Sequence, residues 1–472
     1  MTGIHTGSDA DIVVVGAGAA GLFAALSASE AIAIPSDTLR DERRTRLSIC
    51  ILDATKRPGL KILVSGGGRC NLTNARVEVD DFVTDAPRAL KSVLAAFDHR
   101  STREWFESKG LSTYEEPQGK VFPTSDDARD VLSTLIGACE SAGISIHHEC
   151  EVTDISLAKD GVFRIDSRGG TWRARSVILA TGGRSLPKTG SMGAGFEIAA
   201  RLGHTVTPQV PALVNVRLAP GGLTAELAGL TLPARLDVEY QPTSIEQRCG
   251  RKYAPVSSAC GSVLVTHDGL TGPAALDISG AVGHGIRRSE KPLVVADFWS
   301  LARPTSAWPE FANSDKAPGA CVPPSEAPSP TTFDTFLADV RSLAGASAIV
   351  TTLTRVLPKS LVSRILERAT VDGRKPASTA PEGEWRKIYA LTCHSPLPAI
   401  GTGGYDKAEV TDGGILLGEL DRRTLESTRV PGLLACGEVV NVTGRLGGFN
   451  FQWAWSSGFV AGTAARERLH GT

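Results

Sequence analysis

The stretch DIVVVGAGAAGLFAALSASE, residues 11–30, decides the fold of this chain. It begins with a short β-branched run that ends in glycine, a pattern typical of a buried parallel strand. The alanine- and leucine-rich residues from 19 to about 30 then predict a helix without breakers. Between strand and helix lies GAGAAG (16–21), and a G-x-G-x-x-G in this setting predicts dinucleotide binding.

The three glycines of this fingerprint have different tasks. Gly16 permits the tight turn, Gly18 lets a pyrophosphate approach the backbone, and Gly21 lets the helix pack closely on the strand. The first helical residues, Ala19 and Ala20, would then turn their backbone N–H groups toward the phosphates. The fingerprint therefore predicts a nucleotide cofactor at the first strand end.

An acidic residue should end the second strand, because a carboxylate there holds the ribose hydroxyls. Asp53 closes the strand predicted at 47–53, thirty-two residues after Gly21. The polar segment 31–46, which contains a proline and several arginines, explains this distance as an insertion in the connection. A surface aspartate that merely closes the strand is the alternative interpretation.

Composition narrows the function classes. A chain of 472 residues exceeds the ~250 that one compact core usually holds, so we expect two or three substructures. Fifty basic and fifty-one acidic residues give a net charge of −1, which does not recruit nucleic acid or anionic membrane by itself. Nine scattered cysteines without a CxxC indicate neither a disulfide framework nor a metal site, and they favour a cytoplasmic location. The eighteen uncharged residues 12–29 follow Asp9 and Asp11 instead of a basic region, which argues against a signal peptide or membrane anchor.

Further runs predict the rest of the architecture. Three more strands are expected before residue 184, and alternating patterns then predict a β-rich region that is followed by a linker and a helical unit. The predicted strands are 144–149, 162–165, 176–183, 213–218, 235–240, 262–267 and 432–438. The linkers are the segment 303–332, with seven prolines, and the polar segment 372–384. Helices are expected from Phe333, from Pro358 and over 449–469.

A second glycine-rich loop follows the second strand. It reads SGGGRCNLTN (65–74), with three consecutive glycines between hydrogen-bonding side chains. Backbone N–H groups in such a loop can wrap a flat or anionic ligand. Cys70 within it has no partner cysteine nearby in sequence, so we interpret it as a small buried residue and not as a reactive thiol.

Three long motifs carry a resemblance to a known family: GLKILVSGGGRCNLTN (59–74), THDGLTGPAAL (266–276) and CGEVVNVTGRLGGFNFQWAWSSG (436–458). They resemble the HI0933-like family of FAD-binding NAD(P)/FAD-dependent oxidoreductases, which is typified by aminoacetone oxidases and the bile-acid-inducible flavin reductase. The match runs in order over nearly the whole chain. It implies an α/β fold with a glutathione-reductase-like (Rossmann-type) FAD-binding domain and an inserted β-rich domain that carries a small helical subdomain.

The resemblance also implies the domain order. The FAD-binding domain would be built from both ends of the chain, with the inserted parts between them. The expected ranges are 1–208 and 405–472 for the FAD-binding domain, 209–302 and 385–404 for the β-rich domain, and 303–384 for the linker and helical subdomain.

The resemblance further assigns non-covalent FAD binding to particular positions. Besides the fingerprint residues Gly16, Gly18, Ala19, Ala20 and Gly21, it implies contacts from the strand ends, from the second glycine-rich loop and from the start of the last helix. These positions are Asp53, Lys61, Ser65, Gly67, Arg69, Asn71, Val152, Thr181, Gly182, Gly437, Glu438, Gly448, Asn450 and Phe451. The neighbouring Trp453 and Trp455 are interpreted as packing residues of the last helix and not as flavin-stacking residues.

The catalytic residue is the least determined part of the site. His267 lies at a predicted strand end before a glycine-containing turn, where a histidine could transfer a proton or hold a substrate carboxylate. A structural histidine is the open alternative. The sequence contains no second strand–GxGxxG–helix unit, so NAD(P)H, if it is the electron donor, would have to reach the flavin through an open face.

Three function classes follow. The leading one is an FAD-dependent oxidoreductase that oxidises a small amine or hydroxy compound, or reduces an activated double bond, with the flavin at the junction of the FAD-binding and inserted domains. The alternatives are a tRNA-modifying flavoprotein, against which the near-neutral charge counts, and a flavin redox sensor without turnover. The expected partner is a small-molecule substrate, with neither nucleic acid nor membrane, and the oligomeric state stays open.

Overall fold

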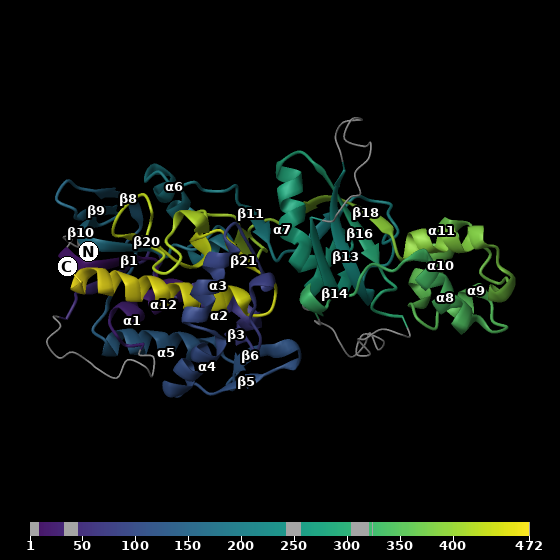
Figure 1. The fold of residues 1–472 in the computed structure, drawn as a ribbon, viewed down its shortest axis with the longest axis horizontal. Helices are drawn as coiled ribbons and strands as arrows, with labels where there is room; N and C mark the ends of the chain where they lie inside the picture. Colours follow the sequence, from purple (N-terminus) through teal and green to yellow (C-terminus); the bar gives the residue numbers. More distant parts are fainter. Residues whose placement is uncertain (1–8, 33–45, 242–255, 304–320, 323, 472) are drawn as a thin grey trace. The chain divides into compact units, whose positions relative to one another are not determined.

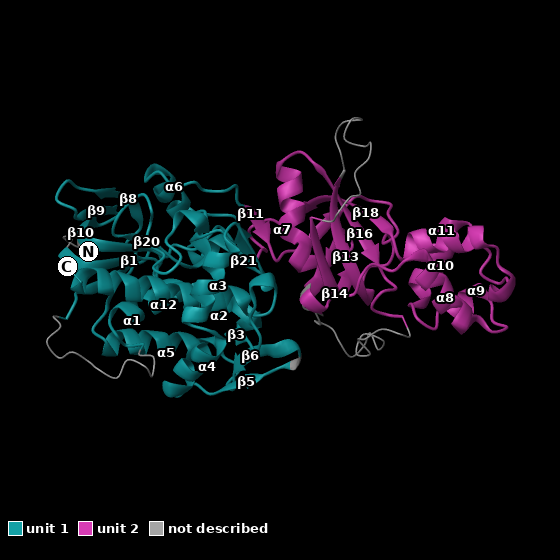
Figure 2. Cartoon of the chain, viewed as in Figure 1, with its two compact units in different colours: residues 1–209, 409–472 teal, residues 210–408 magenta. Residues whose placement is uncertain are grey.

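The chain forms two compact units in this computed structural model, which describes residues 9–32, 46–241, 256–303, 321, 322 and 324–471. One unit comprises Met1–Gln209 with Glu409–Thr472, and the other comprises Val210–Ala408 (Figure 2). The expected boundaries were 208/209 and 404/405. Most of the predicted insertion 31–46 and of the predicted linker 303–332 lies outside the described residues.

The first unit is built on a mixed sheet with strand order β7-β2-β1-β10-β9-β8, in which β20 also pairs with β10. Figure 1 labels β1, β8, β9, β10 and β20 of this sheet. The strands β7, β2, β1, β10 and β20 run parallel, whereas β8, β9 and the first half of β10 form an antiparallel meander. Their bounds are β1 Asp9–Val15, β2 Ile49–Leu52, β7 Ser145–His147, β8 Val152–Leu157, β9 Phe163–Ser167, β10 Gly170–Leu179 and β20 Leu433–Ala435.

Helices cover this sheet because its strands are apolar on both faces. All four residues of β2 are buried, and Ile12 to Val14 of β1 are fully buried. The helices α1 (Ala19–Ala28) and α12 (Phe449–His470) pack side by side, since a β-carbon on Gly462 would lie 2.1 Å from the carbonyl oxygen of Ala24. The uncharged residues 12–29 therefore belong to a strand and a buried helix, and among the described residues no helix is long and apolar enough to cross a membrane.

The first unit also contains shorter strands and further helices. They are α2 Leu60–Val64, a 3₁₀ turn at Ser65–Gly68, β3 Thr73–Asn74, β4 Phe82–Thr84, α3 Pro87–Ala96, α4 His99–Ser108, β5 Thr113–Glu115, β6 Lys120–Pro123, α5 Ala128–Ser141, α6 Ala194–Arg201, β19 Val410–Asp412 and β21 Val442–Gly444.

The second unit contains an antiparallel sheet that closes on itself. Its strand order is β13-β16-β18-β12-β15-β14, and β14 pairs again with β13, so the six strands form a barrel. The strands are β12 Val216–Leu218, β13 Thr231–Gln241, β14 Ser257–Val265, β15 Gly269–Thr271, β16 Lys291–Asp297 and β18 Ser395–Thr402. The short β17 (Cys321–Val322) adds to β14, β11 (Val210–Ala212) precedes the barrel, and helix α7 (Pro273–Arg287) packs on it.

A helical subdomain is inserted between β16 and β18. It consists of α8 Phe333–Ala344, α9 Ile349–Leu353, α10 Lys359–Ala369 and α11 Glu382–Thr392. The indole N–H of the buried Trp299, which follows β16, donates to Asp339 of α8 at 3.0 Å and ties the helices to the barrel. Helix α11 begins inside the polar segment predicted as a linker, because Pro381 starts it and Glu382 and Glu384 stabilise its first turn.

The expected fold class is therefore confirmed. A Rossmann-type domain from both chain ends and an inserted β-rich domain with a small helical subdomain are both present.

Candidate cofactor site

The carboxyl ends of four parallel strands meet at one edge of the first unit's sheet, the edge at which such sheets bind ligands. Backbone hydrogen bonds connect the ends of these four strands. Gly16 donates to Leu52 at 2.8 Å, Ala180 donates to Val15 at 2.9 Å, and Cys436 donates to Leu179 at 2.9 Å. The segments that follow the strands, from which most of the predicted cofactor residues come, therefore start side by side.

The fingerprint loop leaves open space above its middle glycine. A β-carbon on Gly16, whose φ is +107°, would lie 2.4 Å from the carbonyl oxygen of Ala180, and one on Gly21 would lie 1.9 Å from that of Gly16. A β-carbon on Gly18 would instead meet no heavy atom within 4 Å among the described residues. Helix α1 begins directly after Gly18 without a side-chain cap from the described part of the chain, so its first N–H groups are available for phosphate oxygens.

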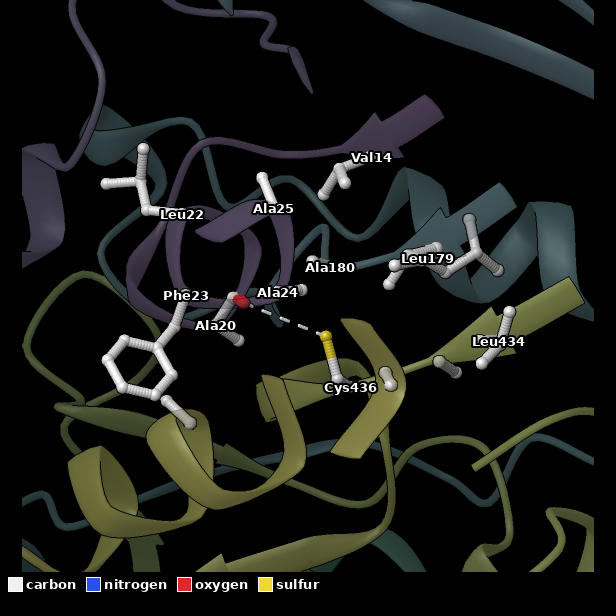
Figure 3. Packing of buried hydrophobic residues seen from close by; sticks show 14 of the residues in the cluster. Val14, Ala20, Leu22, Phe23, Ala24, Ala25, Leu179, Ala180, Leu434 and Cys436 are labelled. Carbon is white, nitrogen blue, oxygen red and sulfur yellow. Dashed lines mark hydrogen bonds between the residues drawn. The ribbon is translucent and has the colours of Figure 1, made fainter. Parts of the chain in front are cut away.

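The inner side of α1 is closed by packing. Figure 3 shows Cys436, at the end of β20, with its sulfur directed at the carbonyl oxygen of Ala20 at 4.0 Å. A β-carbon on Gly437 would lie 2.6 Å from that of Ala20. Residues 436–437 therefore pack against helix α1 and hold it against the sheet.

Asp53 fastens the fingerprint to the second strand. Its Oδ2 accepts a hydrogen bond from the backbone N–H of Ala17 at 2.6 Å, and its Oδ1 accepts from that of Thr55 at 2.8 Å. The N–H of Cys150 donates to the Asp53 carbonyl at 2.7 Å, which brings the chain leading into Val152 to the same place. A carboxylate held here can accept ribose hydroxyls, the role that the sequence assigned to it.

The second glycine-rich loop turns sharply after α2. Gly66, Gly67 and Gly68 all have positive φ, at 54°, 69° and 88°, and a β-carbon on Gly67 would meet no described heavy atom within 4 Å. The Oδ1 atom of Asn71 is buried and finds no hydrogen-bond partner in the described part of the chain. Cys70 is fully buried, which raises the pKa of its thiol to about 12 and agrees with its interpretation as a packing residue.

Two of the predicted loop residues have protein partners. The guanidinium of Arg69 pairs with Glu116 at 2.6 Å and lies over the ring of Phe122 at 4.0 Å. The hydroxyl of Ser65 donates to the carbonyl of Ile62 at 2.7 Å. Both residues thus stabilise the conformation of the loop. Any contact that they make with a cofactor would be additional to these protein contacts.

The turn after β10 provides a further unsatisfied group. Thr181 has a buried Oγ1 without a hydrogen-bond partner among the described residues, and Gly182 has a φ of +70°. Nearby, Lys61 of α2 and Glu438 of the last strand-end loop meet with their Nζ and Oε2 atoms 2.5 Å apart. The two residues that the resemblance implied separately therefore form one ion pair.

The start of α12 lies against the second glycine-rich loop. A β-carbon on Gly448, whose φ is +96°, would lie 2.4 Å from the carbonyl oxygen of Thr73. Asn450 closes the preceding turn, since its Oδ1 accepts from the N–H of Gly444 at 2.9 Å and its Nδ2 donates to the carbonyl of Gly444 at 2.8 Å. The ring of Phe451 stacks on Trp455 with the centroids 5.5 Å apart. No described side chain caps this helix, so its N-terminus can stabilise negative charge.

Trp453 and Trp455 are buried packing residues, as the sequence predicted. Their indole N–H groups donate to the carbonyl oxygens of Gly437 and Leu72, at 3.0 Å and 2.8 Å respectively. Sequence reasoning missed Gln452, which directly precedes Trp453 and accepts from Thr73 at 2.6 Å and from Thr102 at 3.0 Å. The only sequence signal for this role was a polar glutamine within an aromatic segment of the last helix.

His267 is exposed in the turn that joins β14 to β15 of the second unit. The predicted cofactor residues all belong to the first unit. The catalytic role of His267 therefore stays a prediction.

The site fits FAD on the evidence of the chain itself. The open space at Gly18 suits a pyrophosphate, and Asp53 lies where a ribose would be held. The buried oxygens of Asn71 and Thr181, unpaired in the described residues, are suited to polar atoms of a bound group. The uncapped α12 supplies partial positive charge for a flavin that gains negative charge on reduction.

Known proteins resemble this chain along nearly its whole length. A family model described as the HI0933-like protein Rossmann domain matches residues 10–464. A ribosomal RNA dihydrouridine synthase of Escherichia coli is 32% identical over 453 residues, which cover 95% of this chain and 96% of the relative. A 3-dehydro-bile acid delta(4,6)-reductase of Clostridium scindens is 30% identical over 458 residues, 97% of this chain and 99% of the relative. A solved 3-ketosteroid-delta4-(5alpha)-dehydrogenase of Rhodococcus jostii covers 98% of either chain at 16% identity and a TM-score of 0.42.

Proposed function

Because this chain belongs to the HI0933-like family of FAD-dependent oxidoreductases, we propose that it reduces a carbon–carbon double bond conjugated with a carbonyl group. One observation carries the proposal. Two relatives that each match at least 95% of this chain have names that describe the saturation of such a bond, in uridine and in a 3-oxo bile acid. The substrates differ, but the chemistry is shared.

The residues of the first unit would hold the cofactor for this reaction. The N-terminus of α1 binds the pyrophosphate, Asp53 binds the ribose, and Asn71 and Thr181 bind polar atoms of the flavin half. Bound FAD supplies the hydride chemistry. The N-terminus of α12 favours the reduced cofactor because the helix dipole stabilises negative charge. NAD(P)H is the proposed electron donor, reaching the flavin from an open face.

Saturation of the double bond needs a hydride at one carbon and a proton at the other. His267 is the proposed proton donor, because an imidazole can release a proton near neutral pH and this histidine is exposed at a strand end of the inserted barrel.

A small unsaturated carbonyl compound is the first candidate substrate, and the uracil ring of ribosomal RNA is the second. The near-neutral charge of the chain supports the small molecule, because RNA-binding surfaces are usually basic. The 32% identity to the Escherichia coli relative supports the RNA.

The test uses the full chain loaded with FAD under anaerobic conditions. The flavin absorbance is first bleached with NADPH or NADH, and a 3-oxo-4,6-diene bile acid or an unmodified ribosomal RNA transcript is then added. Recovery of the absorbance together with the saturated product supports the proposal and names the substrate class. If neither compound reoxidises the flavin whereas a small amine or hydroxy compound reduces it, the proposed direction is wrong. A flavin that exchanges electrons with none of these compounds would indicate a redox sensor without turnover.

A further inference from the structure

Four residues from separate segments form one charged cluster in the first unit. Lys61 of α2 donates to Glu438 Oε2 at 2.5 Å and to the hydroxyl of Ser185 at 2.6 Å. Ser185 in turn donates to Glu438 Oε1 at 2.9 Å, and the backbone N–H of Thr411 donates to the same oxygen at 2.8 Å. The charged side chains are only 26% and 18% exposed, so water screens their charges incompletely.

The backbone around the cluster lets its side chains approach one another closely. A β-carbon on Gly183 would lie 2.4 Å from Thr411 Oγ1 and 2.6 Å from Glu438 Oε1, so the close approach of both groups requires glycine there. The hydroxyl of Thr411 accepts from the N–H groups of Arg184 at 2.7 Å and Ser185 at 3.1 Å. Thr411 thus holds the turn that presents Ser185 to the ion pair.

The cluster joins three segments that the site assigns to the cofactor. Lys61 lies on the helix that leads into the second glycine-rich loop, Ser185 follows the Thr181–Gly182 turn, and Glu438 follows Gly437. Lys61 and Glu438 are themselves among the positions predicted to contact FAD. A charge close to a flavin changes its reduction potential, because reduction adds negative charge to the ring.

We propose that Lys61 and Glu438 are an opposed charge pair that sets the reduction potential of the bound FAD, with Ser185 and Thr411 as positioning residues. Lys61 favours the reduced cofactor and Glu438 favours the oxidised one. The inference depends on FAD binding and not on the substrate proposed above, so a different substrate would leave it unaffected.

The test measures the reduction potential of bound FAD in the full chain, with a chemical reductant and without substrate. Lys61→Met is expected to lower the ratio of the affinities for reduced and oxidised FAD by about tenfold, which is about 30 mV for a two-electron couple. Glu438→Gln is expected to raise the ratio by about tenfold, and the double variant to return within about threefold of the unchanged protein. The exposed pair Arg164–Asp166 of β9, 2.9 Å apart, provides the matched control, since Arg164→Met and Asp166→Asn should leave the ratio unchanged.

The positioning role has its own readout. In a Thr411→Val background, the two opposite shifts should shrink below about threefold, because the charges are no longer held in one place. Thr411→Ser, which keeps the hydroxyl, should restore them. Shifts of the same sign, or shifts below about threefold with FAD still bound, would overturn the proposal. So would single variants that take up no FAD even in large excess, because the pair would then be maintaining the fold of the site.

Discussion

The Oδ1 atom of Asn71 lies 2.9 Å from the point that a β-carbon on Gly448 would occupy. The two residues are at opposite ends of the chain, one in the second glycine-rich loop and the other at the start of α12. The Oδ1 atom is also buried and has no hydrogen-bond partner among the described residues. A buried acceptor of this kind indicates a ligand that supplies the missing donor.

Gly448→Ala should therefore weaken FAD binding by tenfold or more and destabilise the fold by about 1–3 kcal/mol. The alanine would have to adopt a φ of +96° with its β-carbon 2.4 Å from the Thr73 carbonyl oxygen. FAD titration and urea unfolding measure the two effects. Gly137→Ala in α5 is the control, because its β-carbon meets no described heavy atom within 4 Å and a helical alanine should stabilise by up to about 1 kcal/mol. Equal stability of the two variants would contradict the role given to Gly448.

Gly18→Val should yield a folded protein without FAD. The β-carbon would meet no described heavy atom within 4 Å, and the branched side chain would enter the open space above the fingerprint loop that suits the pyrophosphate. Gly21→Ala should do the opposite and damage the fold, because its β-carbon would lie 1.9 Å from the Gly16 carbonyl oxygen. Thermal unfolding of both proteins without cofactor separates the cases. FAD retained by Gly18→Val would disprove the phosphate site.

The free energy of unfolding should decrease in two steps as the pH is lowered. Both steps arise from the contact between His204 and Glu419. His204 contacts Glu419 at 3.0 Å and Ser427 at 2.8 Å, and Arg429 also pairs with Glu419. Burial lowers the pKa of His204 below its usual 6.5. The unfolded chain therefore binds this proton more readily, and stability is lost as the pH falls below 6.5.

The second step comes from Glu419. The hydrogen bonds from Arg429 lower its pKa from 4.5 to about 2, so its stabilisation is present above pH 4.5 and is lost between 4.5 and 2. Urea unfolding of the unchanged protein and of His204→Gln at pH 7.5 and 5.5 measures the first step alone. The difference between the two pH values should shrink in the variant, and an unchanged difference would assign the pH dependence to other groups.

Alkylation at pH 8 should not inactivate the enzyme through Cys70. Burial raises the pKa of this thiol to about 12, so almost no thiolate is present to react. Cys70→Ala should likewise retain FAD and turnover. Peptide mapping after iodoacetamide treatment measures the modification, and rapid labelling of Cys70 with loss of activity would establish a reactive thiol instead.

His267→Ala should lower the rate of flavin reoxidation by substrate about 10²-fold while FAD stays bound, if the imidazole supplies the proton. Stopped-flow absorbance measures the rate per flavin. His284 in α7, another histidine of the inserted unit, is the control position for substitution by alanine. Loss of FAD at an unchanged rate per flavin would make His267 structural, and no change in either would remove it from the site.

Much of the fold was predictable because its signals are local. The strand–glycine–helix pattern of β1 and α1 and the alternating strands β13 and β14 are written in consecutive residues. The strand β18 was missed because Pro396 and Pro398 argue against a strand. These prolines lie on its exposed face, whereas Ser395 and Leu397 are buried.

The loops of the site were predictable from the sequence, but the side-chain contacts between these loops were not. Lys61 and Glu438 were each expected at the cofactor, yet 377 residues separate them and no pattern links them. Ser185 and Thr411 were missed for a related reason. A single hydroxyl in a turn or short strand carries no periodicity, and only the folded chain shows what it touches.

The central claim, that FAD binds non-covalently at this edge of the sheet, is tested most directly by the visible spectrum of the purified protein followed by acid precipitation. We expect a yellow protein whose precipitate is colourless and whose supernatant contains FAD. A protein that is colourless as purified and takes up no added FAD would contradict the account, as would a flavin that stays in the precipitate.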